Sequence, residues 1–339
     1  MSSSSMVGPS RLKQGVAAHA FGYLGGFNGA GTDRVCPTPL DAYSLMDLAA
    51  VYGLGGVEFP SGEYLTDLGS KEIERVRAYA EARGLYIVLD TDVVDAAKLE
   101  ALIPVAKALG VRTIRVTAST ILCGDRSSLR DNWHRYMSGV VASLRAVSGL
   151  AEDAGVSIAV ENHQDLTSEE LVELCAAVGG DNIGVTLDAV NPLAVVEDPL
   201  AFARRLGSRI KHVHLKDYQI FSTTEGFMLV RSAIGSGVLD VPGLFGVLRE
   251  LAPDATVAIE LAALQARHVR FLTDDYWLGY PPRRAEDILP VLRMREAMAR
   301  PKEEEWRTPW ELGAGHDAIA SYEMRQFEES VAYLRGMKS

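Results

Sequence analysis

The stretch Ser157-Ile-Ala-Val-Glu161 decides the expected fold of this chain. Its small and polar residues alternate with Ile158 and Val160, and the alternation ends on a carboxylate. In a closed barrel, one set of alternating side chains faces the interior and the other set packs against the surrounding helices. We therefore expect a strand that points Glu161 into a barrel at the strand's carboxyl end.

Other segments of the chain repeat this pattern. Gly184–Asp188, Thr256–Glu260 and Gly56–Phe59 each place a carboxylate on the same parity as small residues, and Ile210–Leu215 does so with two histidines. The eight expected strands are Gly15–Phe21, Gly56–Phe59, Leu85–Asp90, Arg112–Thr117, Ser157–Asn162, Asn182–Asp188, Arg209–Leu215 and Thr256–Leu261. The amphipathic segments between them are Leu40–Tyr52, Lys71–Arg83, Ala96–Leu109, Trp133–Ala154, Ser168–Val178, Pro199–Leu206 and Val241–Leu251.

Eight alternations of strand and helix predict an α/β protein, a (β/α)8 TIM barrel. The 339 residues fit one such domain. We expect a flexible N-terminal segment over residues 1–13, the barrel over 14–300, and a C-terminal helical extension over 301–339 that packs on the barrel.

Composition excludes several classes of function. The formal net charge of −11 disfavours binding to a phosphate backbone, so we expect no nucleic-acid partner. No stretch approaches the roughly 20 apolar residues of a membrane span, and the Ser-rich start has no apolar run of a secretory signal. Cys36, Cys123 and Cys175 are too scattered for a disulfide framework or a zinc knuckle. We expect a cytoplasmic protein with free thiols.

The carboxylates and the imidazole converge at the carboxyl ends of the strands, where barrels of this type carry their active sites. Three carboxylates with one imidazole form a mostly hard-oxygen ligand set, which suits Mn²⁺ best, with Mg²⁺ or Co²⁺ as alternatives. Such an ion polarises a carbonyl and stabilises an enediolate. The alternative is structural, in that the carboxylates pair with buried basic residues.

Four motifs carry a resemblance to a known family: Ala159-Val-Glu-Asn-His163, Val185-Thr-Leu-Asp-Ala-Val-Asn-Pro192, His212-Val-His-Leu-Lys-Asp217 and Val257-Ala-Ile-Glu260. Together they resemble strands 5 to 8 of the xylose-isomerase-like barrel superfamily, and the sugar phosphate isomerase/epimerase group is most similar. The resemblance covers roughly residues 15–261. It implies one Mn²⁺-like ion, and its implied ligands are Glu161, Asp188, His214 and Glu260. It does not fix the reaction, because isomerases, epimerases, dehydratases, lyases and endonucleases share this barrel.

Two departures from the epimerase pattern favour a lyase. Where ketose 3-epimerases follow the strand-5 Glu with Pro, this chain has Glu161-Asn-His163, and it continues for 79 residues past Glu260. Both features resemble the large subunit of C-glycoside deglycosidases and the 3-oxo-isoapionate-type decarboxylases. We therefore expect cleavage of a bond β to the ketone of an oxidised (3-keto) sugar through a metal-stabilised enolate. An isomerase or epimerase that forms an enediolate is the alternative. An endonuclease IV-like DNA repair enzyme is disfavoured by the acidic charge and by only seven histidines.

Individual residues receive provisional roles. His163 shares the parity of Glu161 and is expected to act as general base or acid, with a hydrogen-bonding role beside the metal as the alternative. Glu161 and Glu260 are expected to take part in catalysis as well. His212, one layer deeper than His214, is expected to support the site or the core. The expected substrate-binding residues are His19, Glu58, Asn191, Lys216, Asp217, Tyr276 and Trp277.

Two of these assignments have a structural alternative. The step Asn191-Pro192 is also typical of a turn. Tyr276 and Trp277 are suited to covering a sugar ring, and equally to helix packing or a subunit contact. The expected partner is a sugar-like small molecule, and the sequence leaves open a small partner subunit or a homo-oligomer.

Overall fold

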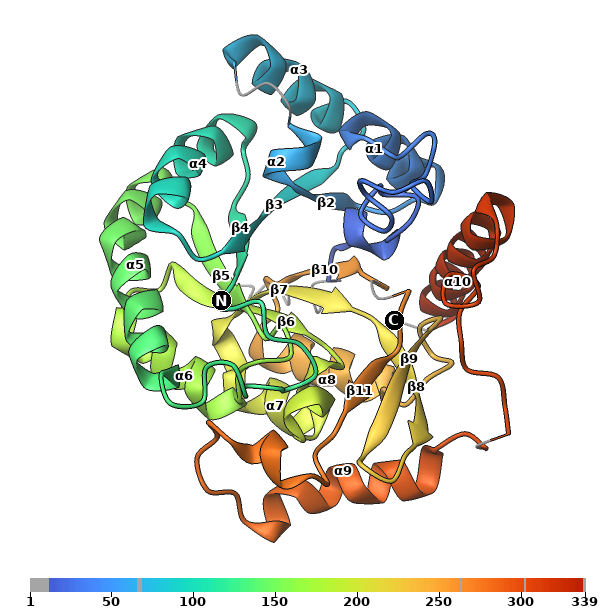
Figure 1. The fold of residues 1–339 in the computed structure, drawn as a ribbon. Coiled ribbons are helices and arrows are strands. Elements are labelled where there is room, and N and C mark those ends of the chain that lie inside the picture. Colours follow the sequence, from blue (N-terminus) through green and yellow to red (C-terminus); the bar gives the residue numbers. More distant parts are fainter. Residues whose placement is uncertain (1–11, 66–68, 262–263, 302, 338–339) are drawn as a thin grey trace, which may run out of the picture.

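The computed structural model describes residues 12–65, 69–261, 264–301 and 303–337. Eight parallel strands close into a barrel in the order β1-β10-β7-β6-β5-β4-β3-β2 (Figure 1). The barrel strands are β1 Gln14–Ala17, β2 Gly56–Pro60, β3 Tyr86–Val93, β4 Thr113–Thr117, β5 Ser157–Glu161, β6 Ile183–Asp188, β7 Ile210–Leu215 and β10 Thr256–Ile259. The α-helices are α1 Ala42–Val51, α2 Ser61–Tyr64, α3 Ser70–Glu81, α4 Ala96–Leu109, α5 Trp133–Ala154, α6 Ser168–Val178, α7 Pro199–Leu206, α8 Val241–Leu251, α9 Ala285–Met298 and α10 His316–Gly336.

The predicted (β/α)8 barrel is confirmed, and local sequence explains where its helices begin and end. The side chain of Asp95 accepts a hydrogen bond from the backbone of Lys98 at the start of α4. Thr167 and Glu170 form a capping box at the start of α6. Helix α5 ends at Gly155, whose φ of 70° places it in the left-handed region that favours glycine. Helices α4 to α8 therefore have the expected boundaries.

The first strand is shorter than predicted. A strand was expected over Gly15–Phe21, whereas β1 ends at Ala17 and a 3-10 helix, η1, follows over Ala18–Ala20. Ala18, Ala20 and Phe21 are buried, so the apolar run continues into packed structure rather than into further strand pairing. This early turn places His19 at the mouth of the barrel.

A second sheet was not anticipated from the sequence. Strands β8 (Asp217–Ser222), β9 (Phe227–Ser232) and β11 (Arg267–Val269) form an antiparallel sheet in the order β11-β9-β8 beside the barrel (Figure 1). Together with α9 and the 3-10 helix η4 (Asp274–Trp277), this sheet encloses a separate hydrophobic cluster. The strand–turn–strand pattern was present in the sequence, since two apolar runs flank a turn ending at Gly226.

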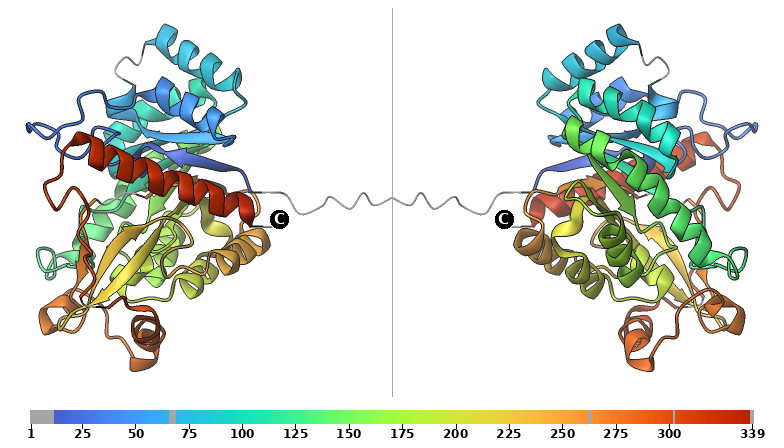
Figure 2. Two further views of the ribbon diagram at one scale, coloured as in Figure 1. Left: turned by 90° about the vertical axis from the view of Figure 1, so that its right-hand side faces the viewer. Right: turned by 90° about the vertical axis from the view of Figure 1, so that its left-hand side faces the viewer.

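The C-terminal extension packs on the barrel as predicted, through α10. Figure 2 shows this helix lying along the side of the molecule next to the second sheet. Phe327, Val331 and Leu334 join the main hydrophobic core, and the carboxylate of Glu323 accepts hydrogen bonds from the backbone of Tyr23 and Leu24. The predicted flexible segment 1–13 falls almost entirely outside the described residues.

Two further observations concern the described part of the chain. Cys36, Cys123 and Cys175 are free thiols, as predicted. None of the described helices combines the length and the apolar character needed to cross a membrane.

Candidate active site

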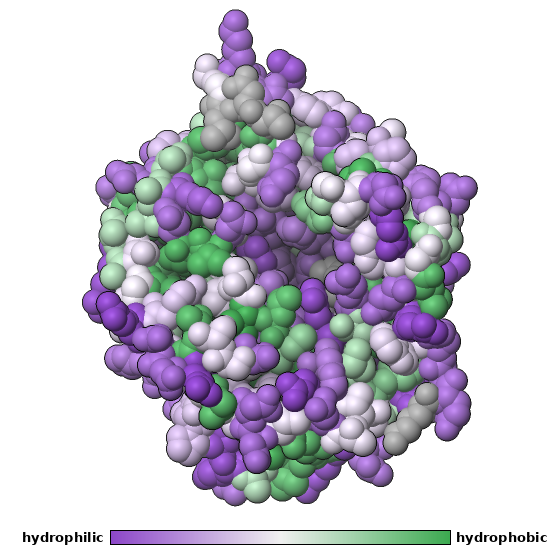
Figure 3. All heavy atoms as spheres, viewed as in Figure 1, coloured by the Kyte–Doolittle hydropathy of each residue, from purple (hydrophilic) through white to green (hydrophobic). Residues whose placement is uncertain are grey.

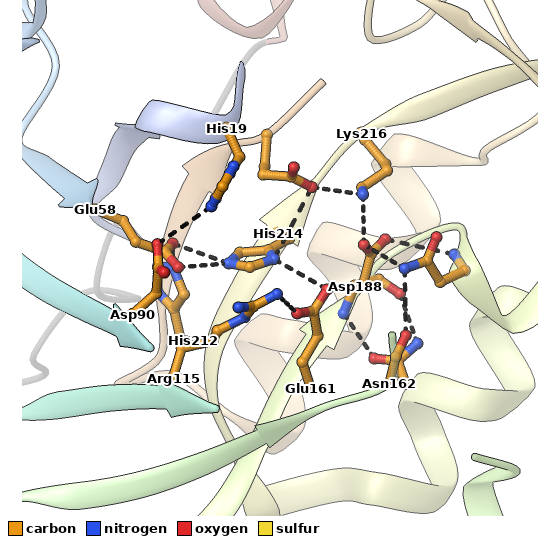
Figure 4. A network of polar contacts seen from close by, with 12 residues as sticks. His19, Glu58, Asp90, Arg115, Glu161, Asn162, Asp188, His212, His214 and Lys216 are labelled. Atoms are coloured by element: carbon orange, nitrogen blue, oxygen red, sulfur yellow. Dashed lines mark hydrogen bonds and ion pairs between the residues drawn. The ribbon is translucent and has the colours of Figure 1, made fainter. Parts of the chain in front are cut away.

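The four predicted metal ligands lie in or directly after four neighbouring strands, β5, β6, β7 and β10. Figure 4 shows three of them, Glu161, Asp188 and His214, meeting inside the barrel. Glu161, Asp188 and His214 each offer one ligand atom, and these atoms lie within 4.8 Å of one another. The Nδ1 atom of His214 lies 3.4 Å from Oε1 of Glu161 and 3.9 Å from Oε2 of Glu260. All four side chains are at most 4% exposed. The strand register therefore brings Glu161, Asp188 and His214 close together, and Glu260 lies beside His214 with its carboxylate paired to Lys216.

Two basic side chains share this cluster. Nζ of Lys216 lies 2.6 Å from Asp188 and 2.5 Å from Glu260, and the guanidinium of Arg115 pairs with Glu161. The structural alternative considered for the sequence, pairing of the carboxylates with buried bases, is thus partly realised. These two cations do not balance the negative charge of the buried carboxylates.

The buried carboxylates outnumber these two cations. Those within the network are Glu58, Asp90, Glu161, Asp188 and Glu260. Even with a protonated His214, the network keeps an excess of negative charge away from water, which is costly unless a further cation is present.

His214 is oriented by a carboxylate below it. Its Nε2 atom lies 2.8 and 2.9 Å from the two oxygens of Glu58, which also contacts Nε2 of His212 at 2.8 Å. The Nδ1 atom of His212 in turn lies 2.6 Å from the hydroxyl of Thr256. Burial alone would lower the pKa of His214, but Glu58 and Glu161 outweigh burial and raise it well above its usual value.

This arrangement leaves Nδ1 of His214 available. Within the described residues Nδ1 has no hydrogen-bond partner, although it is buried. A histidine whose other nitrogen donates to a carboxylate is the usual arrangement at protein metal sites. Three carboxylates and this imidazole nitrogen, with excess negative charge around them, therefore fit a divalent cation.

His163 lies two residues beyond β5, next to the cluster, and lines the cavity above it. Its Nδ1 atom is buried without a hydrogen-bond partner in the described structure. Burial lowers the pKa of His163 to about 4, so the ring is neutral at pH 7 and can accept a proton. Its position agrees with the predicted role as general base.

Two cavities open above the cluster and share His19, Arg115 and His163. The inner cavity, of about 200 Å³, reaches Glu161, His214 and Glu260. The outer cavity, of about 940 Å³, extends over the loops that follow β2, β3 and β4. Figure 3 shows a hollow lined by hydrophilic residues in the middle of this face. A single sugar ring suits the inner space, and a substituent suits the outer one.

The structure brings some of the predicted substrate-binding residues to the cavities and not others. His19 lines both, with its Nε2 atom 3.7 Å from Asp90, and Lys216 lines the inner one. Glu58 lies beneath His214 and reaches neither cavity, because its oxygens are held by the two histidines. Asn191 is buried and donates to Oδ2 of Asp188 at 2.6 Å, so it fixes a predicted ligand instead of facing substrate.

Asp217, Tyr276 and Trp277 have other partners. The carboxylate of Asp217 accepts hydrogen bonds from four backbone N–H groups, three of which belong to the loop after β9. The hydroxyl of Tyr276 donates to the carbonyl of Ala194, and the indole of Trp277 donates to the carbonyl of Phe271. These three residues stabilise loops and the second hydrophobic cluster, as the packing alternative for the aromatic pair anticipated.

Other cavity residues were missed in the sequence. Arg115 alternates with its neighbours in the same sense as Thr113 and Thr117, so it points into the barrel. A charged residue inside an otherwise apolar strand is the sequence feature that could have identified it. The ring of Phe27 packs at a tilt against His19, with ring centroids 4.2 Å apart, and lines the inner cavity. Arg267 reaches the cavity from the unanticipated sheet, so no pattern within the barrel strands pointed to it.

Comparison with known proteins agrees with this geometry. Residues 46–274 match the family described as xylose isomerase-like TIM barrel. The chain belongs to this family. The match covers the strands that supply all four predicted ligands.

Three similar proteins illustrate the range of the family. The 3-oxo-isoapionate decarboxylase of Pectobacterium atrosepticum is 24% identical over 216 residues, which are 63% of this chain and 74% of that protein. An inosose dehydratase of Lacticaseibacillus casei is 26% identical over 119 residues, 33% of this chain and 39% of that protein. The solved D-psicose 3-epimerase of Clostridium cellulolyticum H10 superposes with a TM-score of 0.60 at 15% identity, covering 94% and 98% of the two chains. At that identity the likeness shows the fold alone.

Proposed function

We propose that this protein is a divalent-metal-dependent lyase that breaks the bond β to the ketone of an oxidised sugar derivative. The observation that carries the proposal is the buried cluster of Glu161, Asp188, His214 and Glu260, with its unbalanced negative charge and a neutral histidine beside it. Two relatives named as a decarboxylase and a dehydratase support cleavage, and a relative named as an inosose isomerase supports rearrangement.

The four ligands would hold the ion, with Mn²⁺ as the best fit to a mostly oxygen donor set. A bound divalent cation supplies Lewis acidity that stabilises negative charge developing on a ketone oxygen. The chain contributes the rest. Glu58 orients His214, Asn191 holds Asp188, and the closed barrel wall keeps water from the cluster.

His163 is placed to move the proton. In an elimination, its neutral ring takes the proton from the carbon next to the ketone, and the electrons of that C–H bond form an enolate. The enolate then expels the substituent at the β carbon with its bonding electron pair. In a decarboxylation, loss of CO₂ leaves the enolate directly, and a proton from water, passed on by the neutral ring of His163, would complete the product. Proton transfer of this kind contributes about 10² to 10⁴-fold in rate.

Epimerisation or isomerisation of a ketose is the competing function, in which Glu161 and Glu260 would exchange protons with the substrate. Its support is the fold likeness to a ketose epimerase and the presence of both carboxylates at one cavity. The two functions differ in what happens after the enolate forms.

The test is a substrate panel in ²H₂O with the purified, Mn²⁺-loaded protein. Free ketoses, 3-keto-glycosides and 3-oxo sugar acids would be incubated and analysed by NMR and by CO₂ release. A lyase leaves the ketoses unlabelled and releases an aglycone or CO₂ from a keto-sugar. Inverted or deuterium-labelled ketose at an ordinary enzymic rate, with no cleavage of any keto substrate, would instead establish the epimerase. The cytoplasmic location of the enzyme stays a prediction, and so does its association with a small partner subunit or with further copies of itself.

A further inference from the structure

An arginine from outside the barrel faces the inner cavity. Arg267 begins β11 and lines the cavity together with Arg115 and Lys216. The last two are ion-paired with the buried carboxylates of the cluster. Arg267 has no ion pair within the described residues, and its buried Nε atom has no hydrogen-bond partner there. Its charge is therefore available to a ligand.

Tyr218 on β8 supplies a hydroxyl at the same cavity. The residue is fully buried, lines the cavity, and its hydroxyl has no hydrogen-bond partner in the described part of the chain. Burial raises the pKa of Tyr218, while the nearby positive charges of Lys216 and Arg267 act in the opposite direction, so the phenol is a protonated donor. A buried hydroxyl without a partner is unfavourable, and a ligand that accepts its hydrogen bond removes this cost.

The register of the second sheet explains why these two side chains share one face. Arg267 is opposite Leu229 on β9, and Leu229 is opposite Ile220 on β8. Residues opposite one another in a sheet point to the same face, as do residues two apart along a strand. Tyr218 therefore lies on the face of Ile220 and of Arg267. Most of this face packs into the second hydrophobic cluster, and Tyr218 and Arg267 are its residues that line the cavity.

The charges of the cavity are unevenly distributed. Carboxylates surround His214 on the barrel side, where Asp188 and Glu260 hold the ammonium of Lys216, whereas Arg267 and the Tyr218 hydroxyl face the cavity from the second sheet. A guanidinium with a neighbouring hydroxyl donor is suited to a carboxylate. A neutral hydroxyl group accepts a hydrogen bond from either residue but leaves the positive charge of Arg267 without a counter-charge.

We propose that Arg267 and Tyr218 form a carboxylate subsite, and that the substrate is an oxidised sugar acid. This inference rests on the proposed lyase function and selects its decarboxylating form. The bond between the carboxylate carbon and the carbon next to the ketone breaks, and its electron pair forms the enolate. CO₂ leaves, and one proton completes the product, so no oxidant or reductant is needed.

The test is calorimetric binding of two non-reacting probes to the Mn²⁺-loaded protein. D-gluconate and sorbitol differ by a carboxylate in place of a hydroxymethyl group. We expect wild-type protein to bind gluconate about 10-fold or more tightly than sorbitol, and Arg267→Gln and Tyr218→Phe to lose most of that preference. The matched control is Arg270→Gln, because Arg270 pairs with Glu225 and Asp275 and does not line the cavity. The control should keep the preference.

Three outcomes would overturn the subsite. The first is equal affinity of the wild-type protein for the two probes. The second is an unchanged preference for gluconate in Arg267→Gln, and the third is an equal loss of affinity for both probes in that variant. Tyr218→Phe keeps the aromatic ring, so it tests the hydroxyl with little risk to folding. The proposed function is judged separately on the cleavage panel. Cleavage of neutral 3-keto-glycosides with no preference for gluconate would support the lyase function and reject the subsite. A clear preference for gluconate without cleavage of any substrate would support the subsite and reject the lyase function.

Discussion

Replacing Glu58 with Gln should weaken metal binding, although Glu58 is not among the four proposed ligands. Both oxygens of Glu58 accept from Nε2 of His214, and one also accepts from Nε2 of His212. A glutamine keeps the shape but offers one acceptor and one N–H₂ donor. One histidine must then present a bare Nε2 atom and carry its proton on Nδ1. If that histidine is His214, its metal-binding nitrogen is blocked.

The expected magnitude follows from this conflict of tautomers. Loss of a carboxylate that orients a metal-bound histidine costs about 10–100-fold in affinity, or roughly 1.4–2.7 kcal/mol. We expect that loss in a Mn²⁺ titration followed by calorimetry. Glu81→Gln is the control, because Glu81 pairs with Arg77 on the surface of α3. An unchanged Mn²⁺ affinity in a correctly folded Glu58→Gln protein would refute the reasoning about His214.

Three further changes test other parts of the account. His163→Ala should retain the bound ion and lose about 10²-fold or more in kcat, and loss of the ion, by elemental analysis, would make His163 a ligand instead. Burial raises the pKa of Asp165 from 3.8 to about 7, and the hydroxyl of Ser119 donates a hydrogen bond to this carboxyl group. The proton bound in the folded state therefore stabilises the fold fully below pH 4, and this part of the unfolding free energy is lost as the pH rises through 7. Asp165→Asn should therefore gain stability relative to wild type between pH 4 and pH 8 in urea denaturation, and a constant difference would contradict the assignment. Arg126→Met should cost about 3 kcal/mol or more of unfolding free energy, because it leaves the Glu170 carboxylate without its bidentate partner. A loss below about 1 kcal/mol in the same assay would show that this ion pair is not needed for stability.

The barrel and the convergence of Glu161, Asp188 and His214 were predictable, because both follow from short-range pattern. The two-residue period of Ser157–Glu161 fixes the direction of Glu161, and parallel strands bring such ends to one rim. Position along a strand also placed His212 one layer below His214, as observed. These inferences need only local sequence and the geometry of the fold.

The pairing of side chains around the cluster was not predictable in the same way. Glu58 and Asn191 were expected at the substrate, yet they hold His214 and Asp188, because contacts between strands far apart in sequence decide their partners. Arg267 was missed for a related reason, since the loops between strands form their own sheet. The alternation of residues along a strand predicts whether a side chain points into the barrel, but it does not predict which neighbouring side chain it contacts.

The measurement that tests the account most directly is the metal content of purified protein, by elemental analysis, in wild type and in Asp188→Ala and His214→Ala. Both variants remove a buried ligand from the same cluster, and circular dichroism would confirm that the barrel stays folded. The account predicts about one Mn²⁺-like ion per wild-type chain, and little or none in either variant. Full metal occupancy in either folded variant would contradict the four-ligand site.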